Sequence, residues 1–131
     1  GEPIRLFGSG EQRRDFIYID DLMDTVLRAV LTPSCHNDAY NLGGPEGISL
    51  REAAETVAGC VGGTRIVFEP WPEDYLKVET GDYVASFARL ARHVPLPRFT
   101  PFREGIARTV RAYRDDDGDE DRRRGAAPRR Q

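Results

Sequence analysis

Long apolar runs and internal repeats are absent from this chain of 131 residues. No stretch is long and apolar enough to cross a bilayer, and none resembles a signal peptide. We therefore expect no membrane partner and a cytoplasmic protein. The absence of repeats argues against a solenoid or another array of small units.

Cysteine and histidine are both scarce. Cys35 and Cys60 form no Cys-x-x-Cys pair and match no zinc-ligand spacing. We interpret them as reduced thiols, although two cysteines are also enough for one disulfide. His36 and His93 are each able in principle to act as a base, but neither has a recognisable partner constellation, which favours a structural or solvated role. The sequence thus predicts no metal site.

An excess of positive charge is also missing, because the net charge is −3 at pH 7. The cluster 122–124 is basic, but acids adjoin it, so we predict no nucleic-acid partner. From Arg114 onward the chain has no aromatic or large aliphatic side chain, so burial cannot offset the entropy of ordering. We therefore predict one folded unit over residues 1–113 and a disordered charged tail over residues 114–131.

The most informative stretch runs from Gly8 to Asp21. Gly8 and Gly10 indicate a turn, residues 15–19 predict a strand, and Asp20 and Asp21 are candidate N-cap residues for a helix. Arg13 and Arg14 lie between the turn and the strand, where a guanidinium is well placed to bind a phosphate. The alternative is that both arginines are solvated turn residues.

Periodicity predicts the remaining elements. We expect strands at residues 3–7, 39–42 and 65–69, and hairpin-like pairing of the first with the strand at 15–19. Helices are expected at residues 22–31, after the capping box that begins at Ser49, at residues 82–93, and after Thr100 and Pro101.

Four segments together resemble a known family. The first reads Gly8-Ser9-Gly10-Glu11-Gln12-Arg13-Arg14-Asp15-Phe16-Ile17-Tyr18-Ile19-Asp20-Asp21-Leu22. The others, in order, are Ala39-Tyr40-Asn41-Leu42-Gly43-Gly44, Ser49-Leu50-Arg51-Glu52, and Thr100-Pro101-Phe102-Arg103-Glu104-Gly105-Ile106 with Tyr113. Over residues 1 to about 114, this pattern resembles the later half of the NAD-dependent epimerases/dehydratases, which are extended short-chain dehydrogenase/reductase enzymes acting on nucleotide sugars.

The resemblance implies an α/β fold. It would be a partial Rossmann-like structure, the C-terminal substrate-binding portion of such an enzyme, with short strands and about four helices. In the complete family enzyme, the other portion would bind NAD.

The resemblance also implies substrate-binding residues. Arg14 matches an arginine that contacts the diphosphate of a nucleotide sugar, whereas Arg13 has no such match and is expected to be solvated. Asn41 matches an asparagine at the end of a late strand, with a structural role in the loop as the alternative. Tyr83 lies near a position that can face the nucleotide, and Gln12 aligns with a turn glutamine near the substrate. An exposed or packed tyrosine and a solvated glutamine are the alternatives.

Several family features are missing. A second phosphate-binding arginine would stand at Leu76 and its aspartate at Ser86, while the neighbouring Lys77 offers only a point charge. No Gly-rich turn leads from a strand into a helix, and no tyrosine precedes the only lysine, Lys77, by four residues. We therefore expect the chain to bind no NAD and to catalyse nothing alone.

Three hypotheses follow. The chain is the substrate-side portion of a nucleotide-sugar (UDP- or dTDP-linked) epimerase or dehydratase, a non-catalytic module that binds a nucleotide sugar or a partner enzyme, or a remnant without a ligand. The opening Gly1-Glu2-Pro3 fits a start inside a longer protein and favours the first. Its partner would be a missing N-terminal Rossmann half, or a second copy, because a sheet edge and an apolar face would otherwise be uncovered.

Overall fold

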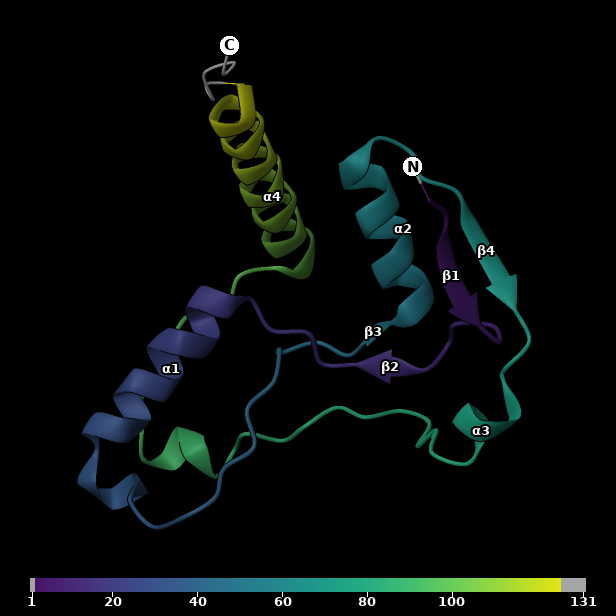
Figure 1. Cartoon of the computed structure of the whole chain (residues 1–131). Helices are drawn as coiled ribbons and strands as arrows, with labels where there is room; N and C mark the ends of the chain where they lie inside the picture. Colours follow the sequence, from purple (N-terminus) through teal and green to yellow (C-terminus); the bar gives the residue numbers. More distant parts are fainter. Residues whose placement is uncertain (1, 126–131) are drawn as a thin grey trace.

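The computed structural model describes residues 2–125, which form a mixed α/β structure with two small sheets and four α-helices (Figure 1). In the first sheet, strand β1 (Ile4–Phe7) pairs in parallel with strand β4 (Ile66–Glu69), with Ile4 opposite Ile66. In the second, β2 (Arg13–Arg14) pairs antiparallel with β3 (Ile48–Ser49). The strands predicted at residues 3–7 and 65–69 are confirmed.

Helix α2 (Leu50–Val61) packs against the β1–β4 sheet. The predicted capping box is present, because the Ser49 hydroxyl accepts from Glu52 N at 3.0 Å and Glu52 Oε2 accepts from Ser49 N at 2.9 Å. The helix ends at Gly62, whose φ of 105° suits glycine. Leu6 of β1 and Ala54 and Ala58 of α2 are buried.

A second small core lies beside helix α1 (Ile19–Leu31), at the far end of the molecule from β4 (Figure 1). Its buried members are Cys35, Leu90 and Val94, which come from the 3₁₀ turns Pro33–Cys35 and Leu90–Arg92 and the residues after them. Thr25 of α1 is fully buried and its hydroxyl donates to Asp21 O at 2.7 Å. The predicted helix at residues 22–31 is confirmed and begins earlier, at Ile19.

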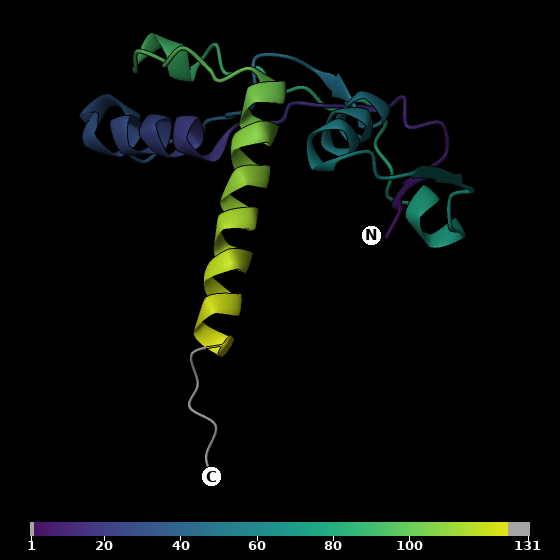
Figure 2. The ribbon, with the colours of Figure 1, turned by 90° about the horizontal axis from the view of Figure 1, so that it is seen from above.

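Helix α4 (Phe102–Gly125) begins after Thr100 and Pro101 as predicted, packs against α2, and projects away from the layer formed by the other elements (Figure 2). The sequence predicts a disordered tail from residue 114, whereas α4 continues to Gly125. A helix already begun at Phe102 extends without a new nucleation step. Arg114 also donates to Val61 O at 3.2 Å, at the C-terminal end of α2. Residues 126–131 of the predicted tail lie outside the described residues.

The predicted strand at 15–19 and its hairpin with residues 3–7 are wrong. β1 pairs with β4 instead, while the turn after β1 is bonded to α2 through Arg51 N and Gly10 O at 2.8 Å. Gly10 has a φ of 72°, and a Cβ there would lie 3.2 Å from Arg51 N, so glycine permits this close contact. The ladder at β2 ends at Arg14, and α1 begins at Ile19 with Tyr18 as its N-cap.

Two further elements predicted from local pattern are wrong. Residues 39–42 form no strand, because Tyr40 and Leu42 pack on the Cys35–Leu90–Val94 core rather than pairing with a neighbour. The only helical structure within residues 82–93 is the 3₁₀ turn Leu90–Arg92, because the backbone at Tyr83 and Ala85 is bonded to the β2 region. The segment after Pro70 contains one short helix, α3 (Glu73–Leu76).

Candidate functional site

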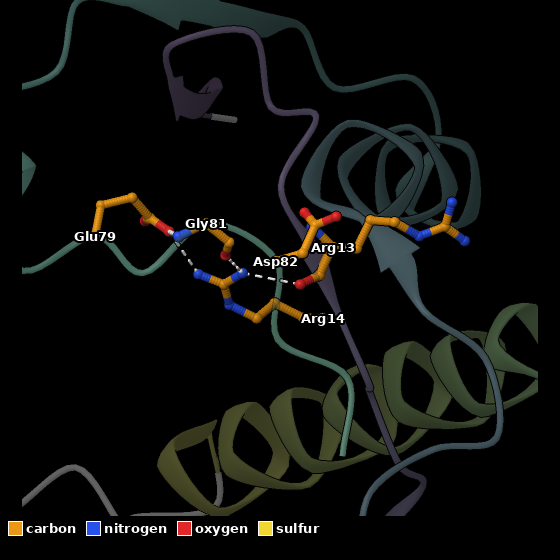
Figure 3. A network of polar contacts seen from close by, with 5 residues as sticks. All are labelled: Arg13, Arg14, Glu79, Gly81 and Asp82. Atoms are coloured by element: carbon orange, nitrogen blue, oxygen red, sulfur yellow. Dashed lines mark hydrogen bonds and ion pairs between the residues drawn. The ribbon is translucent and has the colours of Figure 1, made fainter. Parts of the chain in front are cut away.

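The candidate site is centred on strand β2, which has a neighbour on each side. β3 pairs along one edge, and Tyr83 forms an isolated parallel bridge with Arg14 on the other. Tyr83 N donates to Arg13 O at 3.0 Å, and Arg13 N donates to Asp82 Oδ1 at 2.8 Å (Figure 3). These bonds bring residues 79–83 alongside the two arginines found in the sequence.

The Arg14 guanidinium is bonded to this segment (Figure 3). Nη1 donates to Gly81 O at 2.6 Å and to Arg13 O at 2.8 Å, and Nη2 donates to Glu79 Oε1 at 2.9 Å. The Arg14 and Glu79 side chains are 28% and 22% exposed. Among the described residues, Nε and one hydrogen of Nη2 have no hydrogen-bond partner. The guanidinium is thus fixed in place, partly exposed, and still has donors to offer.

Arg13 points away from Arg14, as expected for successive residues of a strand (Figure 3). Its Nη2 donates to Gly47 O, and a Cβ on Gly47 would lie 3.1 Å from its Nε. Arg13 was expected to be solvated, and its side chain is exposed. The two arginines therefore serve different neighbours.

Of the three other predicted site residues, only one is joined directly to Arg14. Tyr83 lies beside it through the backbone bridge, and its side chain is exposed. Gln12 is half-buried and directly precedes β2. Its backbone carbonyl oxygen accepts a hydrogen bond from Leu50 N at 3.1 Å. Asn41 is exposed, in the segment that leads to Gly43 and Gly44 rather than at a strand end.

Asp15 joins three segments next to this site. Its carboxylate accepts from Ala85 N at 2.8 Å, and its carbonyl accepts from Gly44 N at 3.0 Å. A Cβ on Gly43 would collide with the Asp15 carboxylate. Asp15 therefore holds both the 79–85 segment and the glycine pair against the chain that follows β2.

The histidines and cysteines take no part in this site. His36 Nε2 lies 2.8 Å from Val30 O, and His93 Nδ1 lies 3.2 Å from Ser34 Oγ. Cys35 and Cys60 are both unpaired, with Cys35 buried. Across residues 2–125, no three His, Cys, Asp or Glu side chains are grouped so as to hold a metal ion. The same residues include no helix with the length and apolar character needed to span a membrane.

An apolar cavity of about 260 Å³ lies elsewhere, between the start of α1 and the first turns of α4. Its lining includes Phe16, Tyr18, Phe102 and Ile106. Arg14, Asn41, Tyr83 and Gln12 do not line it. The predicted substrate residues therefore belong to the surface beside β2 rather than to this cavity.

Comparison with known proteins shows which family this chain resembles. Residues 1–43 match the model of the NAD dependent epimerase/dehydratase family. The chain is 31% identical to a UDP-glucuronate 4-epimerase from Thermodesulfobacterium geofontis, over 83% of this chain and 32% of that protein. It is 29% identical to a probable UDP-glucuronate 4-epimerase from Rhizobium meliloti, over 86% of this chain and 38% of that protein. The chain is therefore similar to members of the NAD-dependent epimerase/dehydratase family.

Solved structures of epimerases and dehydratases share the fold of this chain. An epimerase from Methanothermobacter thermautotrophicus superposes with a TM-score of 0.79 at 21% identity, covering 88% of this chain and 34% of that one. A UDP-glucose 4-epimerase from Thermotoga maritima, solved with UDP-glucose, has a TM-score of 0.74 at 21% identity and covers 88% of this chain and 36% of that one. The predicted partial, Rossmann-like α/β fold is confirmed.

The chain spans between 32% and 38% of the length of the curated relatives that it matches first. Sequence reasoning selected Arg14 and Tyr83, which the structure brings together, but it missed Glu79. No local signal points to Glu79, because the pair spans 65 positions of the chain.

Proposed function

We propose that this chain is the substrate-side portion of an NAD-dependent nucleotide-sugar epimerase or dehydratase, and that Arg14 binds the diphosphate of a UDP- or dTDP-linked sugar. One observation carries the proposal. The Arg14 guanidinium is fixed by bonds to Gly81 O and Glu79, stays partly exposed, and keeps N–H donors without partners in the described chain. A positioned planar fork is well suited to phosphate oxygens.

The relatives support the ligand class. UDP-sugar epimerases are among the proteins similar in sequence, and the Thermotoga maritima structure that shares the fold holds UDP-glucose. Tyr83, on the segment bridged to Arg14, would lie next to a bound nucleotide. Gln12 and Asn41 are proposed as weaker contacts of the same substrate, since neither is hydrogen-bonded to the Arg14 side chain among the described residues.

We assign NAD to the complete enzyme and not to this chain. A UDP-glucuronic acid 4-epimerase from Bacillus cereus, which shares the fold, was solved with NAD. The 131 residues of this chain include no Gly-rich strand–turn–helix and no tyrosine four residues before a lysine. Its one lysine, Lys77, is exposed and paired with Asp74 at 2.9 Å. Hydride transfer requires cofactor and base to be held together, so the chain alone is proposed to be inactive.

A partner-binding role is the second candidate, and the exposure of α1 favours it. Six apolar side chains of this helix are exposed: Ile19, Met23, Val26, Leu27, Val30 and Leu31. An apolar stripe of this kind is typical of an interface. We propose that the partner is the remaining portion of an epimerase or a second copy of this chain. The unpaired cysteines support a reducing compartment such as the cytoplasm.

The test is a calorimetric titration of the chain with UDP-glucose and UDP-glucuronate. We expect Arg14→Ala to weaken binding by at least about tenfold, because charge-assisted hydrogen bonds to the diphosphate are lost. Arg14→Lys keeps the positive charge but lacks the planar fork of N–H donors. Its affinity should lie between that of the original chain and that of Arg14→Ala.

Arg28→Ala is the matched control, because Arg28 forms an exposed ion pair with Asp24 on α1, away from β2. Its affinity should equal that of the original chain. Equal affinity for Arg14→Ala, or no binding of any nucleotide sugar by the original chain, would contradict the proposal.

A further inference from the structure

Arg14 already has an anionic partner within the chain. Glu79 Oε1 lies 2.9 Å from Arg14 Nη2 (Figure 3). Both side chains are more than two-thirds buried. The same oxygen accepts from Gly81 N at 2.9 Å. The positive charge proposed to bind a diphosphate is therefore neutralised before any ligand arrives.

The Glu79 carboxylate is held by its backbone surroundings. Gly81 has a φ of 70°, which turns the chain so that its N–H meets Glu79 and its carbonyl meets Arg14 Nη1 at 2.6 Å. Beyond the turn, Asp82 and Tyr83 are bonded to the backbone of Arg13. Glu79 is thus presented to Arg14 by an ordered turn.

We propose that Glu79 is an internal anion that competes with a phosphate group for the positive charge of Arg14. This inference rests on the proposed function, in which Arg14 binds a diphosphate. Carboxylate and phosphate oxygens seek the same N–H donors and repel each other at short range. Glu79 therefore lowers the affinity of the site for a phosphate group while it holds the guanidinium in position.

Glu79→Gln tests the competition, since it removes the charge but keeps an oxygen able to accept from Gly81 N and Arg14. The chain is titrated with UDP-glucose and with inorganic pyrophosphate. We expect about tenfold tighter binding of both, the effect of removing one like charge near a partly exposed anion site. The gain should vanish in the double variant Glu79→Gln/Arg14→Ala.

Asp74→Asn is the matched control. Asp74 lies in α3 on the same segment, is exposed, and pairs with Lys77 rather than Arg14. Asp74→Asn removes one negative charge without changing the site, so the affinity of this variant for UDP-glucose and pyrophosphate should equal that of the original chain. The melting temperature of each variant is measured as well, so that a loss of binding can be distinguished from unfolding.

The outcomes separate this inference from the proposed function. If Arg14→Ala weakens binding but Glu79→Gln binds like the original chain, or more weakly, the competition is wrong and the proposed function stands. Equal gains in Glu79→Gln and Asp74→Asn would also overturn the competition. Unchanged binding in Arg14→Ala, or no binding by any variant, overturns both. A gain confined to Glu79→Gln and dependent on Arg14 supports both.

Discussion

At the scale of single residues, the glycine pair Gly43–Gly44 shows how closely two segments approach. Gly44 is buried, and a Cβ there would collide with the Phe16 carbonyl oxygen and lie 2.8 Å from its carbon. Backbone at this distance cannot move aside as a flexible side chain would. We expect Gly44→Ala to lower the free energy of unfolding by about 1–3 kcal/mol, measured by urea denaturation.

Gly59→Ala is the control for this prediction. Gly59 lies within α2, has no heavy atom within 4 Å of an added Cβ, and has an ordinary helical backbone. The same change should therefore raise stability by about 0.5–1 kcal/mol. A Gly44→Ala chain as stable as the original would show that residues 43–44 are not packed against residues 15–16.

At the scale of elements, the capping box of α2 couples stability to pH. The Ser49 backbone N–H, and then its hydroxyl, lower the pKa of Glu52 from its usual 4.5. A carboxyl whose pKa is lowered by folding stabilises the fold above its unfolded pKa and loses that effect as pH falls through the folded pKa. We expect the melting temperature to decrease as the pH is lowered below about 4.5. Glu52→Gln should make this decrease smaller, and it should lower the melting temperature at pH 7.

Glu55→Gln is the matched control for Glu52. Glu55 is exposed on the same helix and has no hydrogen bond to Ser49. Its acid melting curve should follow that of the original chain. Identical curves for the two variants would mean that the capping box does not contribute to the acid sensitivity.

The elements that were predictable are those specified by their own residues. α2 has its capping box and terminal glycine within the helix and its flanks, and α1 has an apolar period ending before Pro33. Residues 15–19 and 82–93 were mispredicted because their backbones are fixed by distant partners. The bond from Ala85 N to Asp15 spans 70 positions of the chain, and no local pattern contains it.

The candidate site likewise has one residue that could be predicted from the sequence and one that could not. Arg14 is recognisable because it lies in a motif with fixed spacing from the glycine turn. The role of Glu79 depends on the bridge between Tyr83 and Arg14 and on the turn at Gly81, both of which are tertiary. Sequence therefore identifies the cation of this site, whereas its internal anion requires the fold.

At the scale of the whole molecule, apolar surface remains uncovered. Leu27, Val30 and Leu31 of α1 are 56%, 63% and 80% exposed. Within the described chain, β1 and β4 pair only with each other, so each strand has an open edge. Both features fit a chain that spans about a third of its relatives' length, and both favour association.

We therefore expect the isolated chain to self-associate or to be marginally stable, with particle mass rising with concentration in light scattering. The double variant Leu27→Gln/Val30→Lys should shift the chain toward monomer, because it interrupts the apolar stripe and places a cation near the helix C-terminus. Val78→Lys removes a valine that is 72% exposed elsewhere and should leave association unchanged. A monomeric original chain with a cooperative melt at every concentration would contradict the expectation. If both variants dissociate the chain equally, α1 is not the associating surface.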